Sequence, residues 1–222
     1  MKLLGIDTTG IVTTVVYNND GVVSCVEIPF KKHSENLFSA LEQLLAKNDI
    51  PLEEIDCFGV VVGPGSFTGI RIGLAVIKAF AYVHGRRVVP VNSLEVIAYN
   101  KFGITSPEPF WACIDAGAGK VYAQYFNTSL LEEGLPQLVE LQSLAKVLKN
   151  SGTGKLVTTT PEVFDGLDVQ VSEVMLRPEA LAELFKAKFE AGALVEHATA
   201  NPIYLRLSQA ELNIGLKEGV PC

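Results

Sequence analysis

A glycine-rich loop between two apolar segments is the part of this sequence best suited to bind an anion. It has the sequence GPGSFTGIRIG over residues 63–73 and follows the apolar run Cys57–Val62. Backbone N–H groups of such a loop can converge on an anion, and the start of the following helix adds partial positive charge. Alternatively, the glycines only allow close packing of strand and helix. The residues of the predicted site are Gly63, Gly65, Ser66, Thr68, Gly69 and Arg71.

Two turns that begin with aspartate complete this candidate site. Asp7-Thr8-Thr9-Gly10 ends a strand-like segment near the N-terminus, and Asp115-Ala116-Gly117 ends a second one. In a two-lobed nucleotide-binding fold, such aspartates lie near the cleft and could orient water or a metal ion. Each aspartate could instead simply accept a hydrogen bond from its own turn.

Better-known catalytic and nucleotide-binding motifs do not match. A dinucleotide-binding fingerprint requires glycine where Thr68 stands, and the segment around Gly152 lacks two defining residues of a P-loop. His33, His84 and His197 have no metal-binding spacing, and there is no GxSxG nucleophile elbow. The four cysteines form no CxxC pair, so we expect buried thiols in a reducing cytoplasm rather than a zinc site or disulfides.

The composition suits a folded, acidic protein. The 222 residues are 48% hydrophobic, which is enough for one large domain or two small lobes. Neither a signal peptide nor an apolar run of about 18 residues is visible, so no membrane contact is expected. The formal net charge of −7 makes the chain a poor RNA binder on its own, because nucleic-acid affinity depends mainly on lysine and arginine.

The order of predicted elements indicates a duplicated α/β unit. Three strands and a helix precede a strand, a helix, a strand and a short helix, and a new strand set then starts with another Asp turn. Two such units facing each other form the superfold of actin, hexokinase and the heat-shock chaperone ATPases, with mixed sheets flanked by helices. We predict a first lobe over residues 1–102, a second over 103–200, and a C-terminal segment, 201–222, that packs back on the first lobe.

The predicted helix over residues 68–84 is apolar around nearly its whole circumference. Only Arg71 and Lys78 are charged before Tyr82. Such a helix is buried on several sides, either within a large lobe or partly against a partner chain. If a partner is involved, the preceding helix, about 34–48, shares the surface. The residues predicted for this interface are Leu37, Leu41, Leu45, Gly69, Gly73, Val76, Ile77 and Phe80.

Several segments together resemble the TsaB (YeaZ) family, in family order along the whole chain. The matching segments are Asp7-Thr8-Thr9, His33-Ser34-Glu35, the loop 63–73, Pro90-Val91-Asn92-Ser93-Leu94-Glu95, Asp115-Ala116 with Val121-Tyr122, and Pro202-Ile203-Tyr204-Leu205-Arg206 with Ser208-Gln209-Ala210-Glu211. The resemblance implies a cytoplasmic role in making threonylcarbamoyladenosine at position 37 of ANN-decoding tRNAs.

The resemblance further implies a scaffold rather than an enzyme. TsaB is similar to the catalytic subunit TsaD and pairs with it through first-lobe helices; the ATPase TsaE joins them, and tRNA is contacted indirectly. Without TsaD, the chain could pair with itself. Ser93 and Ile97 stand where TsaD carries two metal-binding histidines, so no metal and no catalytic residue are expected here. No cofactor is required, and any ATP or ADP binding is expected to be weak.

Two other functions remain as alternatives. A small kinase-like ATPase of the same superfold would need phosphate-binding loops in both lobes and a base in the cleft. Gly117 and Ala118 stand where many relatives have basic character, and the small residues of that turn argue against a kinase. A metallopeptidase-like protein is suggested by an older label of the family. Ser93 and Ile97 at the metal positions argue against it.

Overall fold

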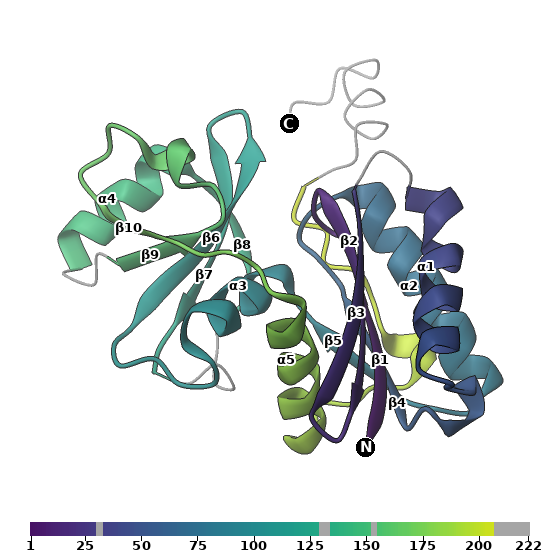
Figure 1. The fold of residues 1–222 in the computed structure, drawn as a ribbon. Helices are drawn as coiled ribbons and strands as arrows, with labels where there is room; N and C mark the ends of the chain where they lie inside the picture. The colour runs from purple at the N-terminus through teal and green to yellow at the C-terminus, as the bar shows by residue number, and fades with distance from the viewer. Residues whose placement is uncertain (30–32, 129–133, 152–154, 207–222) are drawn as a thin grey trace, which may run out of the picture.

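The computed structural model describes residues 1–29, 33–128, 134–151 and 155–206, and it forms two lobes (Figure 1). Several sequence features lie outside this description: the segment 208–211, the glycines at 152 and 154, Cys222, and the side chains of residues 33–36. No helix among the described residues is long and apolar enough to cross a membrane.

The first lobe is built on a five-stranded mixed sheet in the order β3-β2-β1-β4-β5. β1 pairs antiparallel with β2, and β2 with β3, whereas β1–β4 and β4–β5 are parallel. β1 and the neighbouring β4 are buried on both faces of the sheet, which explains their continuous apolar sequences. The strands are β1 (Lys2–Asp7), β2 (Val12–Asn19), β3 (Val22–Pro29), β4 (Cys57–Val61) and β5 (Val88–Val91).

Helices cover both faces of this sheet (Figure 1). α1 (His33–Lys47) and α2 (Phe67–Val83) pack on one face, and α5 (Pro178–Glu190) packs on the other. A short 3-10 helix, η2 (Leu52–Glu54), leads from α1 to β4. The two faces of the sheet are thus buried by helices that come from opposite ends of the chain.

The second lobe repeats the topology of the first. Its sheet has the order β10-β9-β6-β7-β8, with an antiparallel meander β6-β7-β8 and parallel pairs β6–β9 and β9–β10. α4 packs on one face and α3 on the other. The elements are α3 (Ser93–Phe102), β6 (Phe110–Gly117), β7 (Lys120–Phe126), β8 (Gln137–Glu140), α4 (Leu141–Ser151), β9 (Lys155–Thr158), η3 (Pro161–Phe164) and β10 (Gln170–Glu173).

The predicted lobe limits need two corrections. Residues 1–102 were assigned to the first lobe, but α3 packs on the second sheet. Residues 103–200 were assigned to the second lobe, but α5 packs on the first sheet, where the Phe185 ring leaves no room for side chains at Gly5 and Gly59. Val195 also forms a two-hydrogen-bond bridge with Val88 of β5. The amphipathic pattern of α5 shows that one face is buried but carries no information about which sheet covers it.

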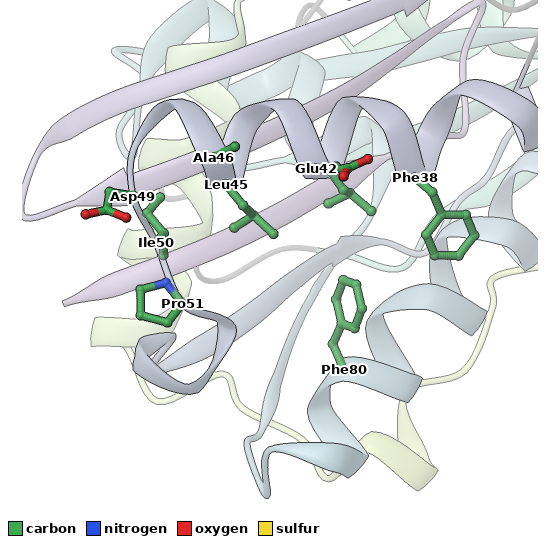
Figure 2. A pocket seen from close by; sticks show the side chains of 9 residues that line it. Phe38, Glu42, Leu45, Ala46, Asp49, Ile50, Pro51 and Phe80 are labelled. Carbon is green, nitrogen blue, oxygen red and sulfur yellow. The ribbon is translucent and has the colours of Figure 1, made fainter.

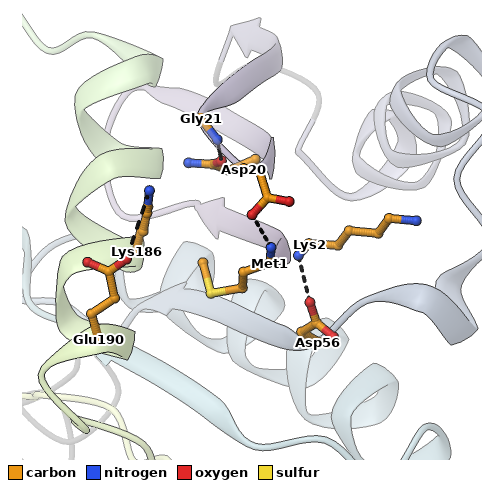
Figure 3. Close-up of polar contacts among 8 residues, drawn as sticks. Met1, Lys2, Asp20, Gly21, Asp56, Lys186 and Glu190 are labelled. Carbon is orange, nitrogen blue, oxygen red and sulfur yellow. Dashed lines mark hydrogen bonds and ion pairs between the residues drawn. The ribbon is translucent and has the colours of Figure 1, made fainter.

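Polar contacts fix the start of β1 within the first lobe (Figure 3). The Met1 amino group forms an ion pair with Asp20 in the β2–β3 turn, and the Lys2 amide donates to Asp56 Oδ2 at 2.7 Å. These contacts hold β1 between β2 and β4.

Candidate functional site

The glycine-rich loop packs directly against the turn that follows β1. The Ser66 amide donates to the Thr9 carbonyl at 2.8 Å, and the Thr8 hydroxyl donates to the Gly69 carbonyl at 2.6 Å. On the other side, the Ser93 hydroxyl donates to Thr9 Oγ1 at 3.1 Å. The structure therefore brings the first-lobe residues of the predicted anion site together. Several of their polar groups already bond to one another.

Asp7 lies beneath this turn and forms the local hydrogen bonds of an Asx turn. Its Oδ1 accepts from the Thr9 amide at 2.8 Å and from the Thr9 hydroxyl at 2.7 Å. The residue is 9% exposed. Burial raises the pKa of the Asp7 carboxyl above its ordinary value, and the hydrogen bonds from Thr9 oppose this shift. Asp7 thus organises the turn from inside the protein.

The raised pKa of Asp7 predicts a pH-dependent effect of Asp7→Asn. Because the folded state binds this proton more tightly than the unfolded state, ionised Asp7 costs stability as the pH rises above the ordinary aspartate pKa of about 3.9. The amide of the substituted side chain would keep an oxygen for both Thr9 donors without this cost. We expect Asp7→Asn to raise the midpoint of urea unfolding at pH 7 and to lose this advantage at pH 3. A destabilised variant at pH 7 would show that the ionised carboxylate is needed.

Asp115 occupies the corresponding turn of the second lobe but differs from Asp7 in its surroundings. It is exposed, and its Oδ1 accepts from the Gly117 amide at 2.8 Å. The Ala116 carbonyl accepts from Nη1 of Arg206 at 2.8 Å. Arg206 therefore brings positive charge to a turn whose own residues lack it. Local sequence could not reveal this, because the two residues are far apart in the chain.

The remaining polar residues of the loop have separate roles. The Ser66 hydroxyl caps α2 by accepting from the Gly69 amide at 3.2 Å. Thr68 is exposed. The Arg71 guanidinium lies 4.1 Å above the Phe67 ring, and its Nε donates to the Tyr204 hydroxyl at 3.1 Å. Arg71 is thus directed at the C-terminal segment in this structure.

The two glycines predicted to face a partner instead face the chain's own turn. A Cβ atom on Gly69 would lie 1.8 Å from the Thr8 carbonyl oxygen, and one on Gly73 would lie 2.4 Å from Thr8 Oγ1. Other residues of the predicted interface are also buried in the first-lobe core: Leu37, Leu41, Val76 and Ile77. Their burial within their own lobe argues against extensive contact of these side chains with a partner, and the partner interface itself stays a prediction.

A groove between α1 and α2 provides an accessible apolar surface beside these residues (Figure 2). It has a volume of about 550 Å³. Phe38 at one end is 62% exposed, and Leu45 and Phe80 are partly buried. Its lining residues are Phe38, Leu41, Glu42, Leu45, Ala46, Asp49, Ile50, Pro51 and Phe80. Leu45 and Phe80, two of the residues predicted for a partner interface, therefore lie at a surface that can be reached, together with Phe38.

The solvent-facing side of α2 continues this apolar surface. Ala75 and Ala79 are exposed, and Tyr82 and Val83 are each 71% exposed. Lys78 is bonded through Nζ to the Ala198 carbonyl at 3.4 Å, on the side of the C-terminal segment. The middle of the exposed face of α2 is left with small, uncharged residues.

Ser93 and Ile97 lie at the start of α3, between the lobes. Ser93 is 6% exposed and bonded to Thr9, and Ile97 is 1% exposed in the apolar cluster under the second sheet. Across residues 1–29, 33–128, 134–151 and 155–206, no three histidine, cysteine, aspartate or glutamate side chains gather as a metal site. Both residues therefore serve packing and local hydrogen bonding.

Comparison with known proteins finds relatives that match nearly the whole chain. The family model of TsaD, described as tRNA N6-adenosine threonylcarbamoyltransferase, matches residues 11–197. The tRNA threonylcarbamoyladenosine biosynthesis protein TsaB of Bacillus subtilis is 31% identical over 95% of this chain and 96% of its own length. The chain belongs to the TsaB family. The Escherichia coli TsaB protein is 27% identical and aligns over 98% of this chain and all of its own length.

A solved structure supports the fold of this TsaB-family chain. YeaZ from Pseudomonas aeruginosa superposes with a TM-score of 0.77 over 92% of this chain and 99% of its own, at 24% identity. The family and the two topologically repeated sheets confirm the predicted actin- and hexokinase-like fold. The TsaB family also ties the chain to threonylcarbamoyladenosine modification of tRNA, as the sequence predicted.

Proposed function

We propose that this chain is the non-catalytic partner subunit that binds and supports TsaD during threonylcarbamoyl transfer to tRNA. The observation that carries the proposal is the exposed apolar surface of α1 and α2, hereafter the helix face: Phe38, Leu45, Ala75, Ala79, Phe80, Tyr82 and Val83. An apolar groove beside small residues suits the close approach of another helix, and large exposed apolar patches commonly mark protein interfaces.

Charge at the rim of the groove adds specificity to this proposal. Glu42 and Asp49 line the groove, and its other lining residues are apolar. Acidic groups at the edge of an interface favour a partner with basic side chains and speed association at low salt. We therefore infer that the surface of TsaD that meets the helix face carries lysine or arginine at its margin. TsaE and tRNA would join through the complex, and the same face could support self-pairing without TsaD.

The state of the predicted anion site supports a non-catalytic role. The Thr8 hydroxyl donates to Gly69, the Thr9 hydroxyl to Asp7, and the Ser66 amide to Thr9. A kinase-like ATPase would need such donors to bind phosphate oxygens. We propose that this loop now shapes the lobe that carries the helix face, that no cofactor is required, and that any nucleotide binding is weak.

The direct test is complex formation between this chain and TsaD of the same organism. We expect a heterocomplex by size-exclusion chromatography with light scattering, and Ala75→Glu should weaken it at least about tenfold, because a charge would be buried at the interface. Ala75 is exposed, so this variant should fold normally. Gly73 is unsuitable for the test, because its side of α2 packs on Thr8.

The matched control places the same charge on the second lobe. Val147 on α4 is 48% exposed, and Val147→Glu should leave complex formation unchanged. Failure to form a complex at micromolar concentration, or equal weakening by both variants, would contradict the proposed docking surface. Threonylcarbamoyl transfer or steady ATP turnover by the isolated chain would contradict its non-catalytic role.

A further inference from the structure

The last described residues, 200–206, run from the first lobe to the second, and we refer to them as the strap. Ala200 is buried in the core beneath α1 and α2. The Ile203 amide then donates to the Val62 carbonyl at 2.8 Å, where β4 ends. Arg206 finally donates to the Ala116 carbonyl at 2.8 Å, near the end of β6. The yellow segment of Figure 1 shows this path along the first lobe.

Side chains of α2 anchor the strap on the first lobe. The Phe67 ring stacks on Tyr204 with 4.2 Å between ring centroids, and Arg71 packs on Phe67 and bonds to the Tyr204 hydroxyl. Lys78 bonds to the Ala198 carbonyl just before the strap. Arg71 and Lys78 are the two charged residues of α2. Both therefore bond to the strap or to the segment that leads into it.

The glycine-rich loop is shaped to let the strap pass. A Cβ atom on Gly63 would lie 2.9 Å from the Ile203 carbonyl oxygen, and Gly63 has a φ of +99°, which favours glycine. The loop at one end of β4 and the strap are therefore fitted to each other. This is a property of the fold that does not depend on a partner.

Arg206 contacts the second lobe at a point further along β6 than the other junction between the lobes. α3 packs against Phe110 and Ala112, with Ile114 at the margin of the same cluster, whereas Arg206 binds Ala116 near the end of the strand. Ala116 lies two residues beyond Ile114 and four beyond Ala112, which corresponds to about 7 and about 13 Å along the strand. Two separate contacts resist rotation of one lobe against the other better than either does alone.

We propose that the strap is a clasp that holds the two lobes in a closed arrangement, with Arg206 as its releasable end. The Arg206 side chain is exposed, so its bond to Ala116 competes with water and can break without unfolding either lobe. The stacked Tyr204 would stay on α2 when the clasp opens. Opening would then change the separation of the Asp7 and Asp115 turns.

Spin-label distances in the full chain test the clasp. One label is placed on α1 through Gln43→Cys and one on α4 through Gln142→Cys, both exposed positions on different lobes. Cys25 and Cys222 are replaced by serine to avoid other labels. Because an exposed hydrogen bond contributes little net free energy, Arg206→Ala should raise the population of longer distances roughly three- to tenfold. Amide exchange in residues 117–122 should accelerate by a similar factor.

Two controls make the outcome decisive. Arg87 is exposed on the first lobe, and Arg87→Ala should leave the distance distribution unchanged. A chain ending after Arg206 should also match the parent, because the strap itself is intact. The proposal is overturned if Arg206→Ala gives the parent distribution, if Arg87→Ala broadens it equally, or if removal of residues 207–222 alone opens the lobes.

Discussion

Gly69→Ala is expected to destabilise the first lobe severely. In an isolated helix this change would be favourable by about 1 kcal/mol, because alanine has the higher helix propensity. Here the new Cβ atom would lie 1.8 Å from the Thr8 carbonyl oxygen. This is backbone at the end of a buried central strand, so neither element can shift without breaking other contacts. We expect a net loss of at least about 3 kcal/mol in the free energy of unfolding.

Urea unfolding followed by circular dichroism measures this loss. Gly10→Ala is the matched control. Gly10 belongs to the turn that contains Thr8, and a Cβ atom at Gly10 meets nothing within 4 Å. We expect the control to change the free energy of unfolding by less than about 0.5 kcal/mol. Similar stabilities for Gly69→Ala and Gly10→Ala would mean that α2 is not held against Thr8 as described.

Lys188→Met is expected to be the second severe substitution. Lys188 of α5 forms an ion pair with Glu95 of α3, and their side chains are only 9% and 5% exposed. Removal of one partner leaves the other charge buried, which typically costs about 3–5 kcal/mol, so we expect a loss of about 3 kcal/mol or more. The double variant Lys188→Met with Glu95→Gln should recover most of it. Glu95 Oε2 accepts a hydrogen bond from the backbone amide of Asn92, and the neutral glutamine keeps an oxygen for this bond.

An exposed ion pair on the same helix supplies the control. Lys186 lies 3.9 Å from Glu190, one turn along α5, and Lys186→Met should cost less than about 0.5 kcal/mol. Denaturant titrations of the three variants and the parent give the comparison. If Lys188→Met costs no more than Lys186→Met, or if the double variant is the least stable of all, the buried pair does not have the role assigned to it.

Local patterns in the sequence were sufficient for the first sheet, including its edge strands β3 and β5, and insufficient for the edge strands of the second sheet. The apolar run before the glycine loop predicted β4, and the all-round apolar helix after it predicted α2. β8 and β10 were missed because each is a four-residue edge strand with polar ends, QLVE and QVSE. Such segments become strands because they pair with an adjacent strand. The local sequence pattern contains little information about that pairing.

The limits were similar at the candidate site. The sequence identified the loop and the Asp7 turn, since glycines and turn residues are local signals. It could not show that Thr8 fills the space beside Gly69 and Gly73, because that contact joins positions about sixty residues apart. The role of Arg206 was invisible for the same reason. The apolar pattern of a helix shows only that one of its faces is buried. Long-range packing decides which part of the protein covers that face.

The placement of α5 and the strap also determines when the first lobe can become stable during synthesis. Residues 178–206 complete a lobe that begins at Met1, and the whole second sheet is translated between the two parts. At bacterial elongation rates of roughly 5–20 residues per second, the nascent first sheet waits on the order of 5–20 s with one apolar face uncovered. A fragment ending near residue 102 would keep that face exposed permanently. Ribosome-associated chaperones are therefore expected to engage the growing chain during this interval.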